Sequence, residues 1–369
     1  MNSRERLLET FDFGSPDRVF RWECIAYWGE TIERWRSEGL RGHPDEVFRM
    51  DEQISPLDFR GRIPVLSGFT GTPFVPAFER EVLRENENSR IVRDGNRVLK
   101  REFKSGKGQS IPQWLEFPVK SESDYDELVE RLDPNDPRRY GDGWDNVEDQ
   151  FRGREFPIAM PLCGFFGHLR NLVGPSKVPH FMYREAPLVR RILAYWTDFN
   201  KTVLGNVQEK LDLDYIMVWE DMCYRTGPLI SPALFEEFLL PCYAELTAYA
   251  RSIGVENVIV DSDGNVSDLL PLFVRGGVKG MIPFEVQAGN DIAEIRERYP
   301  DLVIFGGLDK LALAKGKREI DAELEEKVPF VLESGGFVPA LDHAAPPDIP
   351  FSNFRYYMKR IRELEEAHQ

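Results

Sequence analysis

The chain has 369 residues, of which 42% are hydrophobic and 30% are charged, a composition typical of a folded globular protein. Its 63 acidic and 47 basic residues give a net charge of −16, which argues against binding to nucleic acid or to an anionic membrane surface. No apolar run approaches the roughly 20 residues that cross a bilayer, and the N-terminus lacks a secretory apolar segment. The four cysteines are far apart and form no C-x-x-C pair. These features predict a cytoplasmic protein with reduced thiols.

The N-terminal part of the chain predicts two helices and two strands. Apolar residues recur at helical spacing within Ser3–Phe13, and Glu30–Gly39 predicts a short helix that ends at glycine. Val19–Tyr27 predicts a first strand that is unusually aromatic, and a second strand is expected near Val47–Phe59. We expect both strands to belong to the main sheet.

Residues from about 55 to 118 have a different pattern and predict an insertion. Two segments of alternating polar and apolar residues, around Glu79–Leu83 and Arg97–Lys104, are joined through Asp94-Gly95. Asp-Gly between two such segments indicates a β-hairpin. We therefore predict an antiparallel insertion in an otherwise parallel fold, serving as a lid or as a dimer surface.

From Phe156 onward, short apolar runs alternate regularly with helical segments. The runs that predict strands are Phe156–Leu162, Tyr215–Trp219, Val258–Val260, Gly280–Phe284, Leu302–Phe305 and Phe337–Leu341. The segments that predict helices are Pro187–Leu211, Ser231–Ile253, Ser267–Arg275, Asp291–Tyr299, Ile320–Glu333 and Ser352–Ala367. Strand followed by helix, repeated in this way, indicates right-handed crossovers and a parallel sheet.

With the N-terminal strands the total is about eight, so we predict an α/β fold in which residues 1–369 form a single (β/α)8 TIM-type barrel domain. The antiparallel β-hairpin insertion lies in its N-terminal half. A doubly wound sheet is the alternative. It is disfavoured because no Gly-rich phosphate loop follows any of the predicted strands.

Acidic residues follow nearly every late strand, and a barrel would gather them at one mouth. These residues and the single imidazole among them are Glu220, Asp221, Asp261, Asp263, Glu285, Asp309, Asp342 and His343. Carboxylates and an imidazole that converge can bind a divalent metal or share protons with shifted pKa values. Any one of them can instead be a helix N-cap or part of a turn. The repetition of the pattern favours a functional site.

Three aromatic residues lie at or just beyond the first predicted strand. Trp22, Tyr27 and Trp28 are either core side chains or the flat wall of a substrate pocket. We retain the second role as a hypothesis for substrate binding.

The chain resembles the uroporphyrinogen decarboxylase superfamily, which includes cobalamin-dependent methyltransferases. The motifs that carry the resemblance run over nearly the whole chain and are Ser3-Arg4-Glu5-Arg6, Ser15-Pro16-Asp17-Arg18-Val19, Ile111-Pro112-Gln113-Trp114, Pro118-Val119-Lys120, Trp219-Glu220-Asp221-Met222, Gly227-Pro228-Leu229-Ile230-Ser231-Pro232, Asp261-Ser262-Asp263-Gly264-Asn265, Asp342-His343 and Pro346-Pro347-Asp348. The resemblance implies a TIM-type barrel with its site at the carboxyl ends of the strands.

Two departures from the superfamily bear on the substrate and on the metal. Uroporphyrinogen decarboxylases carry arginines after the first strand that hold substrate carboxylates, whereas residues 22–30 here contain none. The thiol-directed methyltransferases bind zinc through His-x-Cys and a distant Cys, and the matching positions here are Asp261, Asp263 and His343. The resemblance therefore implies a divalent metal, zinc first, in a harder site that polarises an oxygen or a leaving group. Alternatively the metal is lost, and the carboxylates act as acid and base.

The leading hypothesis is a methyltransferase that takes a methyl group from a small O- or N-methylated compound. The chain lacks the D-x-H-x-x-G corrinoid motif, so the corrinoid acceptor would be carried by a partner protein. Asp261, Asp263 and His343 would activate the leaving group, with Glu220 or Asp221 assisting. Glu285 and Asp309, at the same mouth, are expected to contact the substrate.

Two alternatives remain open. A decarboxylase of a small carboxylated substrate would need arginine at the mouth, and Arg225 is the best placed candidate. A barrel that has lost its catalytic metal and only binds a ligand is the non-enzymatic alternative. A homodimer is the default expectation for such barrels.

Overall fold

A computed structural model describes residues 1–23, 25–52, 72–104, 112–141 and 143–368. Its main element is a six-stranded sheet in the order β12-β11-β10-β9-β6-β5, in which every pairing is parallel. The strands are β5 (Ala159–Cys163), β6 (Tyr215–Trp219), β9 (Asn257–Asp261), β10 (Gly280–Ile282), β11 (Val303–Phe305) and β12 (Phe337–Val338). All six strands expected from Phe156 onward are confirmed. The bounds of β6 are as predicted, β9 is one residue longer at each end, β5 begins later and ends one residue further on, and the other three are shorter.

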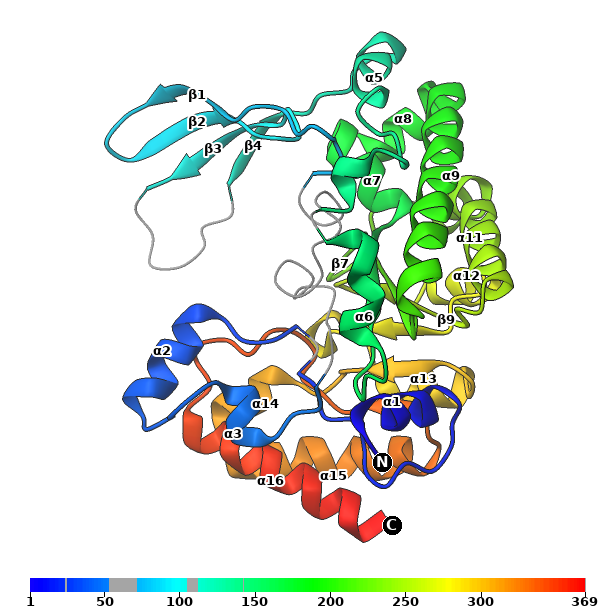
Figure 1. Ribbon diagram of the computed structural model, residues 1–369. Coiled ribbons are helices and arrows are strands. Elements are labelled where there is room, and N and C mark those ends of the chain that lie inside the picture. Colours follow the sequence, from blue (N-terminus) through cyan, green and yellow to red (C-terminus); the bar gives the residue numbers. More distant parts are fainter. Residues whose placement is uncertain (24, 53–71, 105–111, 142, 369) are drawn as a thin grey trace.

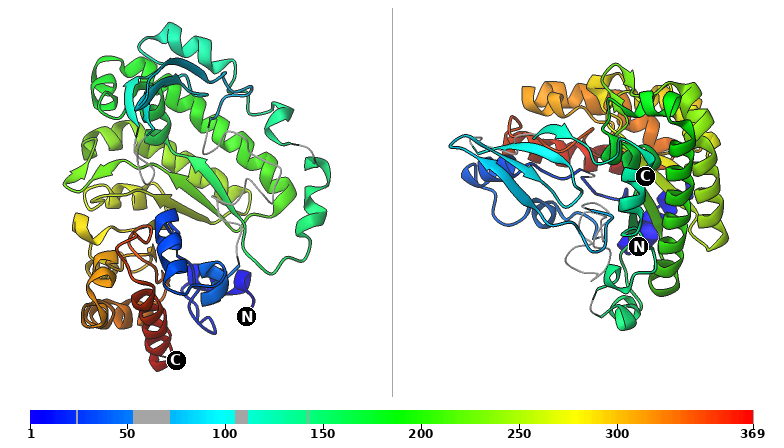
Figure 2. Two further views of the ribbon diagram at one scale, coloured as in Figure 1. Left: turned by 90° about the vertical axis from the view of Figure 1, so that its left-hand side faces the viewer. Right: turned by 90° about the horizontal axis from the view of Figure 1, so that it is seen from above.

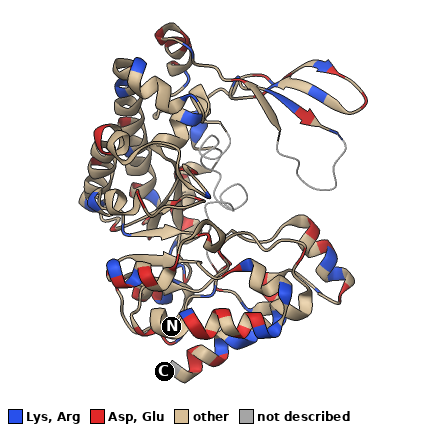
Figure 3. Ribbon diagram, turned by 180° about the vertical axis from the view of Figure 1, so that it is seen from behind, with Lys and Arg blue, Asp and Glu red and all other residues tan. Residues whose placement is uncertain are grey.

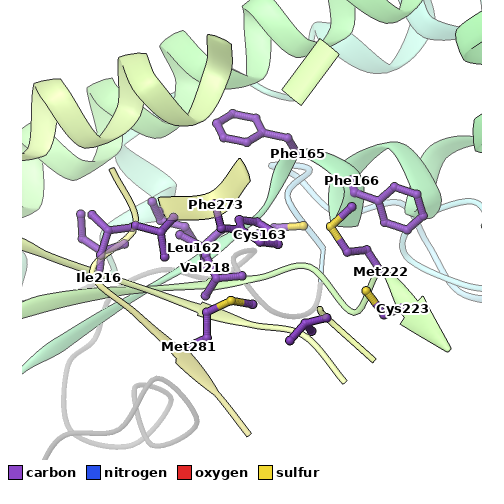
Figure 4. Close-up of a cluster of buried hydrophobic side chains, with 14 of the residues drawn as sticks. Leu162, Cys163, Phe165, Phe166, Ile216, Val218, Met222, Cys223, Phe273 and Met281 are labelled. Atoms are coloured by element: carbon purple, nitrogen blue, oxygen red, sulfur yellow. The ribbon is translucent and has the colours of Figure 1, made fainter. Parts of the chain in front are cut away.

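Both faces of the sheet are buried, which is why its strands are continuously apolar. Along β6 the side chains alternate, so that Tyr215 belongs to an inner cluster whereas Ile216 and Val218 belong to the outer core. The inner cluster contains residues from all six strands, together with Phe11 of the N-terminal helix and Phe20. Figure 4 shows part of the outer core.

The helices cover the outer face of the sheet. α9, α11 and α12 pack together over one part of the sheet, and α14, α15 and α16 pack over another (Figures 1 and 2). The α-helices are α1 (Ser3–Phe11), α2 (Gly29–Ser37), α3 (Pro44–Phe48), α5 (Glu122–Val129), α6 (Val147–Phe151), α7 (Phe165–Val173), α8 (Val178–Arg184), α9 (Ala186–Leu211), α10 (Pro232–Leu234), α11 (Leu240–Ser252), α12 (Leu270–Arg275), α13 (Ile292–Arg298), α14 (Lys310–Lys315), α15 (Lys317–Glu333) and α16 (Phe351–His368). Short turns of other helix types are η1 (Pro137–Arg139), η2 (Trp144–Asn146), η3 (Phe235–Leu239) and η4 (Val286–Ala288).

The predicted helix Ser231–Ile253 is divided into three pieces. Ser231 caps α10 as expected, and a π-helical turn, η3, follows before α11 continues to Ser252. Pro241 is the second residue of α11 and has no backbone N–H to donate to the preceding turn, which accounts for the irregular winding.

The two N-terminal strands expected in the barrel are not found among the described residues. Val19–Tyr27 forms only an isolated parallel bridge, between Tyr27 and Ala345. The Val47–Phe59 prediction begins inside α3 and runs into residues 53–71, outside the described residues. The structure therefore shows an α/β fold with a parallel sheet, and closure into an eight-stranded barrel stays a prediction.

Side-chain carboxylates explain why the first predicted strand is absent. The N–H of Val19 donates to Glu365 at 2.6 Å, and the N–H of Arg21 donates to Asp51 at 2.8 Å. Glu23, inside the predicted strand, accepts in turn: the N–H of Leu341, which follows β12, donates to its carboxylate at 3.0 Å. Backbone donors that would form a strand ladder are thus satisfied by acids, so the segment stays irregular.

The insertion forms a separate antiparallel sheet, which we call the arm. It has the order β1-β2-β3-β4, with β1 (Glu81–Glu85), β2 (Ser89–Arg93), β3 (Leu99–Phe103) and β4 (Gln113–Glu116), and it projects from the body of the molecule (Figure 1). The Asp94-Gly95 turn joins two antiparallel strands as expected, but the partner of β3 is β2, which was not predicted; the predicted partner Glu79–Leu83 overlaps β1, which pairs with β2 instead. The other parts of the expected insertion, 53–71 and 105–111, lie outside the described residues. Within the ranges that the structure describes, no helix has both the length and the apolar composition needed to cross a bilayer.

Candidate functional site

The centre of the candidate site is a carboxylate–imidazole pair at the carboxyl ends of β9 and β12. His343 Nε2 lies 3.5 Å from Asp263 Oδ2, and both side chains are partly exposed. This interaction raises the pKa of His343, and burial opposes the shift. The structure therefore brings together two of the predicted site residues that are far apart in the sequence, and the imidazole favours its charged form.

Asp261 lies beside this pair as the last residue of β9. Burial raises the pKa of its carboxyl to about 8, with further contributions from Asp263 and Asp221, whereas His343 lowers it. At neutral pH its carboxyl therefore holds a proton. The site combines a carboxyl that favours its protonated form with an imidazole whose pKa is raised, and both are groups that can donate a proton when protonated.

Gly264 holds the turn that follows Asp263. Its φ of +78° and its closeness to Cys223, whose backbone would lie 2.6 Å from a Cβ at this position, both require glycine. The Gly264 N–H donates to Glu285 Oε2 at 3.0 Å. The carboxylate at the end of β10 thus fixes the backbone that presents Asp263.

Lys310 is a cation at this mouth that the sequence prediction missed. Its Nζ lies 3.2 Å from Asp342 Oδ1 and 3.5 Å from Glu285 Oε1. Asp342 is fully buried and also accepts the backbone N–H groups of Val286 and Lys310. Burial raises the pKa of Asp342, and Lys310 opposes the shift. The signal was available, because Lys310 directly follows the predicted residue Asp309.

Glu220 and Asp221 are engaged by neighbouring groups. Glu220 is fully buried and accepts the N–H groups of Phe165 at 2.9 Å and Gly167 at 2.7 Å, together with the Tyr243 hydroxyl. Burial raises the pKa of Glu220 to about 7, and these hydrogen bonds oppose it. Its carboxylate therefore holds the N-terminus of α7.

Asp221 pairs with Arg170, which also donates to the Asp221 carbonyl at 2.5 Å. The guanidinium of Arg170 lies 5.3 Å from the centre of the Trp219 ring. Arg170 is thus the arginine next to the ends of the strands. Arg225, which the sequence reading favoured, is exposed in the turn of the β7–β8 hairpin (Cys223–Tyr224 and Gly227–Pro228).

Asp309 serves as the N-cap of α14. Its carboxylate accepts the N–H of Leu311 at 2.9 Å and the side-chain amide of Gln287 at 2.9 Å. Because both oxygens are occupied, the residue positions α14 and, through it, the adjacent Lys310.

The three aromatic residues lie in three different environments. Trp22 packs edge-to-face on Phe305 in the inner cluster, with ring centres 5.8 Å apart. Tyr27 packs on Trp35 and donates to Asp45 at 3.0 Å. Trp28 precedes α2 and is 44% exposed. They do not form one continuous wall.

Glu23 is a buried acid that the sequence prediction also missed. Its carboxylate accepts a hydrogen bond at 3.0 Å from the N–H of Leu341, the residue before Asp342. Burial raises the pKa of Glu23 to about 8. An acid within the aromatic first segment was the available signal. The carboxyl end of the sheet therefore holds several acids that favour their protonated form.

A divalent metal at this mouth would need several donors that converge on one point. Among the side chains that the structure describes, no group of three His, Cys, Asp or Glu residues is arranged to hold a metal ion. Asp263 and His343 pair with each other, and Asp261 favours its protonated form. The metal implied by the resemblance therefore stays a prediction, and the chemistry proposed for the site is that of its own side chains.

Comparison with known proteins places the chain in a family. The family model for uroporphyrinogen decarboxylase matches residues 101–364, which is more than half of the chain. The chain belongs to the uroporphyrinogen decarboxylase family. Of the elements described above, the match includes the whole parallel sheet and all of the predicted strand-end residues.

Individual relatives within the family are distant. The uroporphyrinogen decarboxylase of Hydrogenobaculum sp. is 33% identical over 73 residues, covering 20% of this chain and 21% of that protein. That of Thermus thermophilus is 25% identical over 231 residues, covering 57% and 61%. The chain thus spans less than two thirds of either relative.

A solved methyltransferase from Methanosarcina mazei has a similar fold over almost its whole length. The TM-score is 0.61 at 18% sequence identity, and the match covers 98% of this chain and 99% of that one. At this identity the likeness shows the fold alone.

Proposed function

We propose that this member of the uroporphyrinogen decarboxylase family is a methyltransferase. In the proposal it takes a methyl group from a small O- or N-methylated compound and passes it to a corrinoid carried by a partner protein. The observation that carries it is the Asp263–His343 pair with the proton-bearing Asp261 beside it. The likeness of the fold to a methyltransferase supports the same proposal.

The chemistry requires a proton at the leaving group. The carbon–oxygen or carbon–nitrogen bond breaks, the methyl group leaves with neither electron of that bond, and the oxygen or nitrogen keeps the pair and takes up a proton. The reduced corrinoid, as second substrate, supplies the electron pair of the new bond. An unprotonated alkoxide or amide is a poor leaving group, so a positioned acid accelerates this step.

The protein supplies that acid. His343, held by Asp263, or the carboxyl of Asp261 donates the proton. Because His343 lowers the pKa of Asp261, the protonation of the two groups is linked. Burial keeps the proton on Asp261 at neutral pH, where an ordinary aspartate would be ionised. In this proposal the mouth is that of a (β/α)8 barrel, supported by the single inner cluster that all six strands share.

In the proposal the protein is cytoplasmic and binds neither nucleic acid nor membranes. The net charge of −16 supports the second point. Cys163, Cys223 and Cys242 are unpaired, which supports a reducing compartment.

The test is anaerobic incubation of the protein with chemically reduced cobalamin and a panel of O- and N-methyl compounds. We expect methylated cobalamin, seen by its absorbance, with at least one donor, and a loss of that activity in the Asp263→Asn variant. No methylated cobalamin across the panel would contradict the proposal.

A decarboxylase is the second candidate, because the curated relatives carry that name. It would use the same acid to protonate the carbon left after loss of carbon dioxide. Release of carbon dioxide from a small carboxylic acid without any corrinoid would favour it. The acidic mouth disfavours a substrate with several carboxylates.

A further inference from the structure

A groove of about 520 Å³ lies between α3 and α16, two helices whose contacting residues are 314 positions apart in the sequence. Phe48 of α3 packs edge-to-face on Phe354 of α16, with ring centres 5.1 Å apart, and Arg362 donates to the Phe48 carbonyl. Figure 1 shows the two helices side by side. None of the described residues that line the groove belongs to the candidate site, so the groove is a separate feature of the molecule.

One wall of the groove is apolar. Val47 is 42% exposed there, and beside it Phe48 and Met358 belong to the buried core. Because these two core side chains are held by their neighbours, the wall offers a fixed surface to the apolar part of a ligand.

The other wall of the groove is basic. Arg355, Lys359 and Arg362 line it from α16, and their spacing of four and three residues places them on one face of the helix. A fourth cation, Arg49, directly follows α3. In Figure 3, α16 is the helix that ends at C, and it carries four Lys or Arg residues followed by three Glu residues in its last turns.

The two acids that line the groove do not neutralise these cations. Glu363 lies 2.8 Å from Lys359 and also pairs with Arg360, and Glu366 is exposed. Among the residues that the structure describes, three guanidinium groups here form no ion pair: those of Arg49, Arg355 and Arg362. Three such cations against one remaining acid leave a net positive charge at the groove.

The hydrogen-bonding groups of Arg362 are incompletely satisfied by the protein. Its Nε is buried and has no hydrogen-bond partner within the described ranges, and the same holds for Nε of the neighbouring Arg21. Burial lowers the pKa of Arg362, and the guanidinium groups of Arg21 and Arg49 lower it further, whereas Glu365 opposes them. Guanidinium groups that repel one another and lack acceptors would be stabilised by a bound anion.

We propose that the groove between α3 and α16 binds a soluble phosphate monoester. The phosphate oxygens accept from Arg362, whose planar guanidinium suits a phosphate, and the apolar part of the ester lies against Val47 and Phe48. A phosphate suits the groove better than a single carboxylate, because it carries about two negative charges and faces several unpaired guanidinium groups. The ester is soluble, because the net charge of −16 repels the chain from an anionic membrane surface.

The test is isothermal titration calorimetry of the intact protein at low salt with phenyl phosphate, a soluble monoester that has an apolar ring. We expect one site per chain, weaker binding of inorganic phosphate, which lacks an apolar part, and no binding of phenol, which lacks the charge. Arg362→Gln should raise the dissociation constant for phenyl phosphate by at least about tenfold, because charge-assisted hydrogen bonds are lost.

Two further variants keep the test independent of any effect of Arg362 on folding. Arg355 is exposed, so Arg355→Gln should fold normally and should raise the same constant by roughly threefold. Val47→Ser should weaken the binding of phenyl phosphate and leave that of inorganic phosphate unchanged. The matched control is Arg318→Gln, which removes the same charge at a side chain that is 92% exposed on α15, and it should leave both constants unchanged.

The proposal would be overturned if phenyl phosphate did not bind, or if it bound equally well to the natural chain and to both arginine variants. Sedimentation of the protein with vesicles of phosphatidylcholine and phosphatidic acid, without binding of phenyl phosphate, would also overturn it, because the occupant would then be a lipid. These measurements contain no methyl donor and no corrinoid, so their outcome is independent of the proposed function.

Discussion

The charged residues are balanced at one end of the parallel sheet and unbalanced at the other. At the amino end, the buried Asp214 before β6 accepts from Arg4 at 2.7 Å and from Arg154 at 2.6 Å, and also from the N–H of Ile158. At the carboxyl end, Lys310 is shared by Glu285 and Asp342, and among the described residues Asp263 pairs with His343. Two arginines and two aspartates balance at the first cluster, because Asp212 also pairs with Arg4 and Arg154, whereas acids exceed cations at the second.

This difference separates a structural cluster from a proton-holding one. Where two guanidinium groups contact the Asp214 carboxylate, its charge is compensated, and the cluster joins α1 to the segments before β5 and β6. Where buried acids have too few cations, the acids keep protons at neutral pH, as Asp261 and Glu23 do. The experiments below compare the two ends, from the largest expected effect to the smallest.

Replacing Asp263 by asparagine should have the largest effect on activity. The change removes the carboxylate that raises the pKa of His343, so methyl transfer should fall by about 10² to 10⁴-fold, the range for a lost acid or base. Because Asp263 is partly exposed, the free energy of unfolding should change little. Initial rates and urea denaturation measure the two quantities.

The control for this variant is Asp268→Asn, an exposed aspartate on the same loop. It should retain the natural rate. Equal losses in both variants would show that the loop, rather than the Asp263–His343 pair, limits activity.

Replacing Asp214 by asparagine tests the amino end. Two arginines would lose their buried carboxylate, and breaking such a pair typically costs about 3–5 kcal/mol of unfolding free energy. The rate per folded molecule should stay unchanged. Asp212→Asn is the matched control, because Asp212 also pairs with Arg4 but its side chain is 76% exposed, so its loss should cost less than about 1 kcal/mol. Similar losses in the two variants would contradict the comparison.

The sequence was sufficient to locate the sheet and the acids at its carboxyl end. The six strands from Phe156 onward are continuous apolar runs, and this pattern follows directly from burial on both faces. The segment Val19–Tyr27 forms no strand among its described residues, because Glu365 and Asp51 accept the N–H groups of Val19 and Arg21, and Glu23 accepts the N–H of Leu341. Glu23 lies within the segment and was visible in the sequence, whereas Glu365 and Asp51 lie 346 and 30 residues from their donors, so no local pattern reveals them.

The partners of the site residues could not be predicted from the sequence either. The acids after the strands were predicted, but the groups that they contact depend on which strand ends are neighbours. Glu220 is engaged by the backbone N–H groups at the start of α7, and Asp309 by α14. Asp261 and Asp263 lack such partners in the described structure, and this difference emerges only in three dimensions.

The pH dependence of stability should also distinguish the two ends. The pKa of Asp261 is about 8 in the folded chain against an ordinary value of 3.8, so the folded state binds the proton more tightly. Its contribution is complete below the unfolded pKa and is lost as the pH rises through about 8. The free energy of unfolding should therefore decrease between about pH 5 and 8, and in Asp261→Asn it should decrease by at least about 1 kcal/mol less.

The raised pKa values of Glu23 and Glu220 add the same pH dependence to the unfolding free energy of the natural chain and of Asp261→Asn. Their contributions therefore cancel when the two proteins are compared. Urea denaturation at several pH values measures the difference. Parallel curves for the two proteins would show that Asp261 is ionised in the folded chain, and would remove one of the two proposed acids.

The smallest expected effect comes from Lys310, which touches no reacting atom in the proposal. Lys310→Met should lower the rate by about tenfold, because Glu285 and Asp342 lose the cation that positions the loops bearing Asp263 and His343. Lys201→Met is a close control: Lys201 also pairs with two acids, Asp198 and Glu245, and is 23% exposed against 17% for Lys310.

Amide hydrogen exchange tests the positioning role of Lys310 without an activity assay. The Gly264 N–H is held by Glu285 and the Val286 N–H by Asp342, so both should exchange faster in Lys310→Met and at the natural rate in Lys201→Met. Lys310→Arg should restore their protection, because arginine keeps the charge and reaches both carboxylates. Unchanged exchange at these two amides in Lys310→Met would show that Lys310 does not position the loops. The contrast between the two ends of the sheet would then depend on Asp261, Asp263 and His343 alone.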